Sequence, residues 1–189
     1  MQNLKINQDG ICPQAQFIES PNYDLREIDD INLIVIHNIS LPPNKYGGEG
    51  VIDLFTNQLN TNEHPYYAEI AHLKVSSHFF IRRDGSLIQF VPCTKRAWHA
   101  GVSKWEDREK CNDFSIGIEL EGSDFEAFEP KQYDTLKLLI ESLKMTYPIQ
   151  SVVGHSDIAP GRKTDPGPYF NWNKICLLYT SPSPRDRTR

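Results

Sequence analysis

Residues 31–36, Ile-Asn-Leu-Ile-Val-Ile, constrain the fold of this chain more than any other feature. A short run rich in β-branched apolar side chains is typical of a strand that is buried on both faces. Such a strand needs other elements to cover it, so the run indicates a layered α/β fold. The run also places His37 at the carboxyl end of the predicted strand, where sites tend to form in sheets.

Four further segments predict strands of the same sheet. Residues 77–81 and 86–91 predict an antiparallel pair, because Asp84-Gly85 between them suits a turn that needs positive φ. Residues 114–120 and 151–154 are short apolar stretches with strand character. The sheet is therefore expected to be mixed.

Two segments carry apolar side chains at helical spacing, residues 51–59 and 130–147. Pro130 suits the first turn of the second helix, and Pro148 prevents its continuation. Strands that alternate with helices predict a single α/β domain in which a mixed central β-sheet is flanked by helices.

Composition and charge exclude several classes of function. Of the 189 residues, 39% are hydrophobic and 24% are charged, as in ordinary globular proteins. With 20 Lys and Arg against 25 Asp and Glu, the net charge is -5, and no electrostatic footprint for nucleic acid stands out. Residues 1–10 hold no apolar run long enough for a signal peptide or a membrane span. The four cysteines form no CxxC pair, so we expect reduced thiols and a cytoplasmic protein.

Three side chains that can bind a metal ion occur where a fold tends to expose them. His37 and His155 follow predicted strands, and Asp165 lies in the rigid loop Thr164-Asp-Pro-Gly-Pro168. Two imidazoles and a carboxylate are a ligand set for catalytic zinc, with a fourth position left for water. The alternative is that both histidines are ordinary surface or core residues.

Two further residues are candidates for the chemistry at such a metal. Glu119 lies in a predicted strand, where burial raises the pKa of a carboxyl and a nearby cation lowers it, so that it can exchange protons with water. Lys163, two residues before Asp165, could stabilise an oxyanion. The alternatives are a structural carboxylate at the edge of a strand and a solvated loop charge.

The remaining histidines and several aromatic residues are expected to be mainly structural. We expect the other four histidines to be core or hydrogen-bonded residues rather than metal ligands. These are His64, His72, His78 and His99. Four aromatic side chains are candidates for the wall of a sugar-binding cleft, although core or surface positions explain each of them equally well. They are Tyr66, Tyr67, Trp98 and Trp105.

Five motifs, in unbroken order over about residues 16–175, resemble the 1,6-anhydro-N-acetylmuramyl-L-alanine amidases of bacterial cell-wall recycling. They are Val35-Ile-His-Asn-Ile-Ser-Leu-Pro-Pro43, Arg82-Arg-Asp-Gly85, Arg96-Ala-Trp-His-Ala-Gly101, Cys111-Asn-Asp-Phe-Ser-Ile-Gly-Ile-Glu-Leu-Glu-Gly122 and Lys163-Thr-Asp-Pro-Gly-Pro168. The resemblance implies the N-acetylmuramoyl-L-alanine amidase-like fold, which phage T7 lysozyme and the peptidoglycan recognition proteins share.

The resemblance also implies a role for each candidate residue. His37, His155 and Asp165 match the family's zinc ligands, so Zn²⁺ is the expected cofactor. Glu119 matches the proposed general base, and Lys163 matches the residue that stabilises the tetrahedral intermediate. Three further positions are implied to bind substrate, two of them lysines where the family has arginines. They are Asn38, Lys74 and Lys110.

From the resemblance we expect a zinc amidase that cuts the bond between the muramic acid lactyl group and L-alanine in small, imported muropeptides. The expected domain covers residues 16–176, preceded by an N-terminal arm over 1–15. Residues 177–189 have no apolar periodicity and are predicted to be a disordered tail, foreign to the family's C-terminal end. We expect a monomer that binds neither nucleic acid nor membranes.

Other classes of protein remain open from the sequence. A peptidoglycan recognition protein without catalysis would share the fold, but such proteins typically lack a zinc ligand or a helper residue. A thiol hydrolase could use Cys93 or Cys111 with His99, although neither cysteine lies at an evident strand-to-helix elbow. An exported amidase that acts on intact wall would need a signal peptide.

Overall fold

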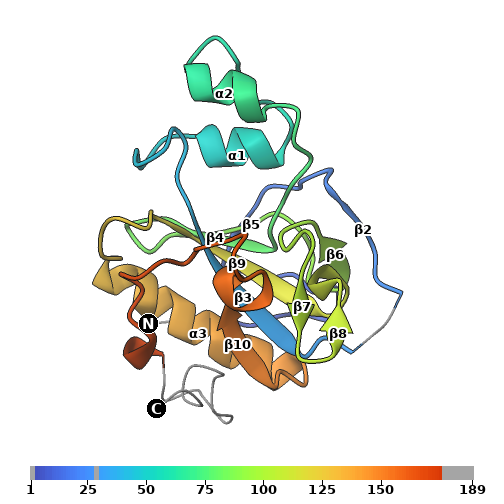
Figure 1. Ribbon diagram of the computed structural model, residues 1–189. Helices are drawn as coiled ribbons and strands as arrows, with labels where there is room; N and C mark the ends of the chain where they lie inside the picture. Colours follow the sequence, from blue (N-terminus) through green and yellow to red (C-terminus); the bar gives the residue numbers. More distant parts are fainter. Residues whose placement is uncertain (1–2, 28–29, 176–189) are drawn as a thin grey trace.

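The computed structural model describes residues 3–27 and 30–175. A six-stranded sheet in the order β1-β5-β4-β9-β3-β10 forms its centre (Figure 1). The strands of this sheet are β1 (Gln16–Phe17), β3 (Leu33–Ile39), β4 (Phe79–Ile81), β5 (Leu87–Gln89), β9 (Ser115–Glu121) and β10 (Ser151–Gly154). Two small two-stranded sheets are formed by β2 (Tyr23–Leu25) with β6 (Lys95–Ala97), and by β7 (Lys104–Trp105) with β8 (Arg108–Glu109).

Four α-helices accompany these strands in the described part of the chain. They are α1 (Gly50–Phe55), α2 (Pro65–Ile70), α3 (Pro130–Thr146) and α4 (His155–Ile158). Cys111–Asp113 and Trp172–Lys174 form short 3₁₀ helices. None of the helices among the described residues has both the length and the hydrophobicity needed to cross a membrane.

β4, β9, β3 and β10 run parallel to one another, whereas β5 and its parallel neighbour β1 run in the opposite direction. β3 pairs in parallel with both β9 and β10, and β4 pairs in parallel with β9. β4 and β5 form the antiparallel pair predicted around Gly85, whose φ is +86°. The predicted mixed central sheet with flanking helices is therefore confirmed.

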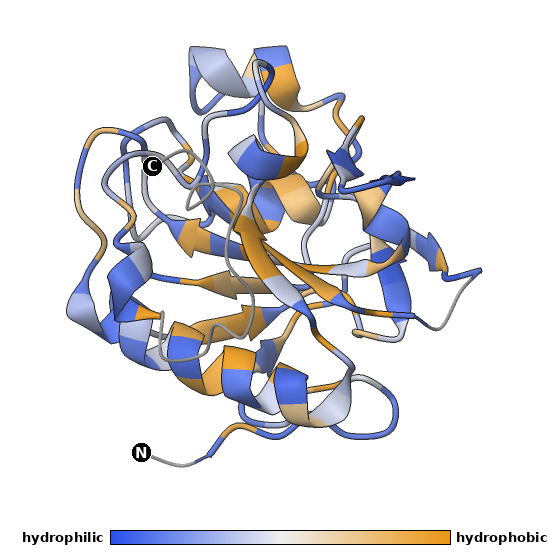
Figure 2. Cartoon of the chain, turned by 60° about the horizontal axis from the view of Figure 1, so that its bottom comes forward, coloured by the Kyte–Doolittle hydropathy of each residue, from blue (hydrophilic) through white to orange (hydrophobic). Residues whose placement is uncertain are grey.

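One face of the sheet packs on α3. The side chains of Ile34, Ile116 and Ile118 are fully buried in one cluster with Leu136 and Ile140 of the helix. The helix begins after Glu129, whose backbone N–H donates to the side chain of Gln132 at 3.0 Å, and it ends before Pro148. In Figure 2 the central strands are largely orange, whereas α3 alternates between blue and orange, as expected for a helix with one buried side.

The opposite face of the sheet carries a different set of side chains. Phe80, Ile88 and Phe90 pack there against Leu54 and Phe55 of α1. Figure 1 shows α1 and α2 beyond the β4–β5 end of the sheet, on the side away from α3. A layer of helices and loops therefore lies over this face of the sheet, on which His37 of β3 and Glu119 of β9 also lie, in register with Phe80.

The sequence-based boundaries differ from the structure at two elements. The strand that was predicted to end at residue 36 continues to Ile39, because β9 pairs with it along its whole length. The helix predicted over 51–59 stops at Phe55, because Asn57 adopts a left-handed φ of 60°. The predicted tail over 177–189 lies outside the described residues.

Arg26 holds several of these layers together. Its guanidinium group donates to four backbone carbonyls at 2.7–3.2 Å, one of them at residue 93 and three within residues 112–115. They belong to Cys93, Asn112, Asp113 and Ser115. Burial lowers the pKa of Arg26 to about 10, so the side chain keeps its charge at neutral pH. Arg26 thus connects the β2 segment to the start of β9.

We predict that Arg26→Met lowers the free energy of unfolding by about 3 kcal/mol, because several buried carbonyls lose their donor while an apolar side chain of similar length remains. Urea unfolding of the metal-free protein measures the change. The control is Arg82→Met, which removes an ion pair to the exposed Glu49 and should cost no more than about 1 kcal/mol. Equal effects of the two substitutions would contradict the role given to Arg26.

Candidate active site

Three side chains from separate elements meet at the carboxyl edge of the sheet. His37 lies in β3, His155 is the first residue of α4 directly after β10, and Asp165 belongs to a loop. Because β3 and β10 are parallel, their carboxyl ends share one edge. His37 Nδ1 lies 3.0 Å from both His155 Nδ1 and Asp165 Oδ2, and His155 Nδ1 lies 3.1 Å from Asp165 Oδ2.

The loop of Asp165 is fixed by hydrogen bonds at three points. Its carbonyl oxygen accepts from the Ser156 N–H at 2.9 Å, and the Gly167 N–H donates to the Thr164 carbonyl at 3.0 Å. The Thr164 hydroxyl donates to Asp124 Oδ2 at 2.5 Å. These hydrogen bonds fix the backbone of the loop, so that the Asp165 carboxylate is held in position opposite the two imidazoles.

The electrostatics of the cluster favour a neutral His37 imidazole and an ionised Asp165 carboxylate. Burial lowers the pKa of His37 to about 4, despite the facing Asp165. Burial alone would raise the pKa of Asp165, but the facing side chains of His155 and His37 hold it below its usual range. Neutral imidazole and carboxylate are the forms in which these groups bind metal ions.

The arrangement fits a metal ion of the zinc type. Bond lengths of about 2.0–2.2 Å around a tetrahedral zinc ion place its ligand atoms roughly 3.3 Å apart, close to the separations seen in the cluster. His155 Nε2 lies 3.0 Å from the Ala100 carbonyl, which can only accept, so the proton is on Nε2 and the lone pair of Nδ1 points into the cluster. Within the described residues, these three side chains form the only group of this kind that could hold a metal ion.

Glu119 lies beside this cluster, in register with His37 across the β3–β9 pair. The residue is 8% exposed, and its Oε2 atom is buried without a hydrogen-bond partner among the described residues. Burial raises the pKa of Glu119 well above its usual value, the charge of Asp165 raises it further, and Lys163 opposes the shift. A buried carboxyl with a free oxygen is suited to proton transfer with a bound water.

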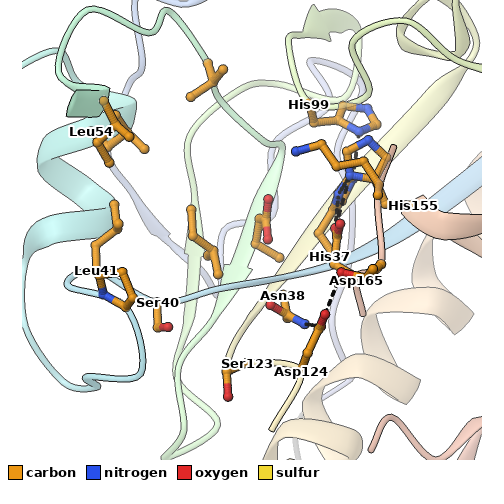
Figure 3. Close-up of a pocket in the computed structure, with 18 of the residues that line it drawn as sticks. His37, Asn38, Ser40, Leu41, Leu54, His99, Ser123, Asp124, His155 and Asp165 are labelled. Carbon is orange, nitrogen blue, oxygen red and sulfur yellow. Dashed lines mark hydrogen bonds and ion pairs between the residues drawn. The ribbon is translucent and has the colours of Figure 1, made fainter. Parts of the chain in front are cut away.

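These groups line a cleft of about 570 Å³. Figure 3 shows His37, His155 and Asp165 gathered on one side of it, and Leu41 and Leu54 on the other. The cleft is large enough for a sugar with an attached peptide. The side that holds the His-His-Asp cluster is polar, and the side that holds Leu41 and Leu54 is apolar.

The structure places the other predicted site residues at different distances from the cleft. Asn38 and Lys163 line it, although the Asn38 amide already donates to Asp124 at 2.7 Å and to the Pro166 carbonyl at 3.0 Å. Lys74 is exposed between two cleft-lining residues, Leu73 and Val75. Lys110 is exposed at a neighbouring depression of about 580 Å³, which Arg162 shares with the cleft.

Two of the four aromatic residues that were candidates for the cleft wall lie at the cleft. Tyr66 and Trp98 line the cleft, but Tyr67 is buried against α1 and Trp105 packs on a separate core cluster. Asp124, which the sequence did not single out, lines the cleft and binds both Asn38 and Thr164. Nothing in the local sequence around Asp124 distinguishes it from an ordinary loop aspartate.

The thiol hydrolase is incompatible with the geometry. Cys93 and Cys111 are fully buried, and burial raises the pKa of both thiols. His99 contacts His37 and Ser115 instead of a cysteine. The described cysteines therefore provide no thiolate nucleophile.

The sheet thus carries, at one edge, a His-His-Asp group that could hold a metal ion and a buried glutamate beside it. The family model for N-acetylmuramoyl-L-alanine amidase matches residues 27–168. The chain belongs to this family, and the predicted fold and enzyme class are confirmed.

Individual relatives agree with this assignment. The chain is 50% identical over 183 residues to the 1,6-anhydro-N-acetylmuramyl-L-alanine amidase AmpD of Citrobacter freundii, which covers 95% of this chain and 98% of the relative. A crystal structure of a selenomethionine AmpD derivative superposes with a TM-score of 0.87 at 52% identity, covering 92% of this chain and 98% of that chain. The amidase AmiD of Escherichia coli, in complex with anhydro-N-acetylmuramic acid-L-Ala-D-γ-Glu-L-Lys, gives a TM-score of 0.60 at 29% identity, covering 97% and 69%.

Proposed function

We propose that this amidase is zinc-dependent and that it hydrolyses the lactyl–L-alanine amide bond of 1,6-anhydro-N-acetylmuramyl peptides in the recycling of cell-wall fragments. The observation that carries the proposal is the convergence of His37, His155 and Asp165 next to the buried Glu119 in one cleft. The names of the relatives support the substrate, since the Citrobacter freundii relative is named a 1,6-anhydro-N-acetylmuramyl-L-alanine amidase.

In this proposal His37, His155 and Asp165 hold the zinc ion. When bound, zinc supplies Lewis-acid polarisation of the scissile carbonyl and makes water more acidic. The rigid loop of Asp165 and the hydrogen bond at His155 Nε2 hold two of the ligands in place before the metal arrives.

Glu119 and Lys163 perform the proton transfer and the charge stabilisation. Glu119 removes a proton from the attacking water as the water oxygen bonds to the carbonyl carbon. Negative charge then develops on the carbonyl oxygen, and the ammonium group of Lys163 stabilises it from the wall of the cleft. Glu119 returns the proton to the alanine nitrogen as the carbon–nitrogen bond breaks.

We predict that the purified protein holds about one zinc ion per chain and that His155→Ala loses most of it, because one of three protein ligands is removed. Elemental analysis after dialysis measures the metal. The exposed His72 provides the control, since His72→Ala should keep parental zinc. A chelator should abolish activity of the parent. Unchanged zinc in His155→Ala would overturn the ligand assignment.

A second prediction separates proton transfer from metal binding. Glu119→Gln should keep zinc and lose about 100-fold or more in kcat, because the amide cannot accept the proton of water. The matched control is Asp134→Asn on the exposed side of α3, which should retain parental kcat. Turnover close to that of the parent in Glu119→Gln would show that Glu119 is not the base.

Several features bear on the natural substrate. AmiD was solved with an anhydromuramyl tripeptide, which supports a small muropeptide as the ligand of this cleft too. Lys74 and Lys110 carry positive charge near the cleft and could pair with acidic groups of the peptide, although without the bidentate geometry of arginine. We propose a cytoplasmic monomer that meets only imported fragments and needs neither nucleic acid nor a membrane.

We predict a higher kcat/KM for anhydromuramyl peptides than for matched peptides with a reducing-end muramic acid. The preference should be weaker than in relatives with arginines at positions 74 and 110, because lysine selects geometry less strictly. Steady-state kinetics on the two matched peptides decides the question. Equal values, or faster release of peptide from polymeric wall, would overturn the recycling role and leave the amidase assignment intact.

A further inference from the structure

The imidazole of His37 has a contact at each of its ring nitrogens. Nδ1 faces His155 and Asp165, whereas Nε2 lies 2.9 Å from Nδ1 of His99. His99 Nε2 lies 3.1 Å from the hydroxyl oxygen of Ser115. Figure 3 shows His99 next to His37 and His155 on the polar side of the cleft. A line of side-chain contacts therefore runs from Ser115 to the candidate metal site.

The donor and acceptor roles of the groups fix the direction of each hydrogen bond between Ser115, His99 and His37. The Cys111 carbonyl can only accept, so its 2.6 Å contact with the Ser115 hydroxyl uses the Ser115 proton. The Ser115 oxygen then accepts from His99 Nε2–H, and a neutral imidazole that donates at one nitrogen accepts at the other. His99 Nδ1 accepts from His37 Nε2–H. This leaves the lone pair of His37 Nδ1 free to bind a metal ion.

A glycine in the middle of β9 makes room for His99. Gly117 is buried and lies on the same face of β9 as Ser115 and Glu119. A Cβ atom at Gly117 would lie 2.5 Å from Cγ and 2.7 Å from Nδ1 of His99. Glycine inside a buried strand weakens it, and often marks a place where another group approaches closely. Here that group is the imidazole of His99.

The backbone of the same segment also holds His155. The carbonyl of Ala100 accepts from His155 Nε2, and it accepts from Arg162 at 2.7 Å as well. The N–H groups of His99 and Ala100 both donate to Asn112 Oδ1, at 3.1 and 2.8 Å. Two adjacent residues thus contact both histidines of the cluster at Nε2, one through its side chain and the other through its carbonyl.

We propose that His99 is a positioning residue, which with Ser115 holds His37 in the tautomer and orientation that present Nδ1 to zinc, and that Gly117 is required to accommodate it. The inference rests on the proposed zinc site. Partners that orient a metal-binding histidine typically change metal affinity 10–100-fold when they are removed.

The experiment measures the zinc dissociation constant of the full chain by competition with a chromophoric chelator. His99→Phe keeps a ring of similar size but has no acceptor, so it should weaken zinc binding by about 10-fold or more. His99→Asn can place an amide oxygen near the original Nδ1 position and should restore most of the affinity. Ser115→Ala, which removes only a hydroxyl, should weaken zinc in the same direction by a smaller factor.

Gly117→Ala tests the space for the imidazole. It should reproduce the loss seen in His99→Phe, because the new Cβ displaces the His99 ring. Gly48→Ala is the control, since a Cβ there meets only the Leu41 carbonyl, at 4.0 Å. Circular dichroism of each metal-free variant shows whether it folds. If His99→Phe or Gly117→Ala fails to fold, Ser115→Ala, which makes the smallest change, still tests the proposal.

A spectroscopic signature distinguishes positioning from general packing. In the zinc-loaded parent, the Nε2–H proton of His37 should appear in nitrogen-edited NMR as a slowly exchanging resonance, and it should be lost in His99→Phe and regained in His99→Asn. Parental zinc affinity in both His99→Phe and Ser115→Ala would overturn the inference alone. A parent protein that binds no zinc would overturn the proposed function together with it.

Discussion

The parallel pairing of β3 with β9 is the constraint on which the rest of the structure depends. Its register places His37 opposite Glu119, so the pairing itself brings a metal-binding group next to a candidate base. A slip of one residue would turn every side chain of one strand to the other face. The apolar face on α3 prevents such a slip, because Ile116, Ile118 and Leu120 are fully buried there.

The two faces of β9 therefore have different roles, one in the hydrophobic core and the other at the candidate active site. The face toward α3 contributes apolar burial, whereas the other face consists of Ser115, Gly117, Glu119 and Glu121, all of them buried. Burial of this polar row is unfavourable unless its groups are paired. Ser115 is paired with Cys111 and His99, Glu121 accepts from the backbone N–H groups of Gly47 and Arg83, and Glu119 retains one free oxygen. The unpaired atom lies where the chemistry is proposed.

Much of this could be predicted from the sequence, because the features involved have local signals. The run before His37, the Asp84-Gly85 turn and the periodicity between Pro130 and Pro148 identify the central strands, the hairpin and α3. The residues of the His-His-Asp cluster could be proposed because each follows a predicted strand or lies in a proline-rich loop. Their meeting at one edge could not be derived without the parallel order of β10, β3 and β9.

The parts that could not be predicted depend on contacts between distant segments. His99 was expected to be structural or hydrogen-bonded, but its partner His37 is 62 residues away in the chain. From the sequence, Gly117 is only a glycine that weakens a strand; its role depends on the His99 ring, which occupies the space of a side chain at this position. The short strands β6, β7 and β8 have too few residues to show a period, and their pairing is set by the surrounding core.

X-ray absorption at the zinc edge of the purified parent protein tests the central claim most directly, since it reports the identity and distance of the atoms bound to the metal. We expect four nitrogen or oxygen neighbours at about 2.0–2.2 Å, with the scattering pattern of two imidazoles. A sulfur neighbour at about 2.3 Å, or a zinc ion without imidazole scattering, would contradict the site built from His37, His155 and Asp165.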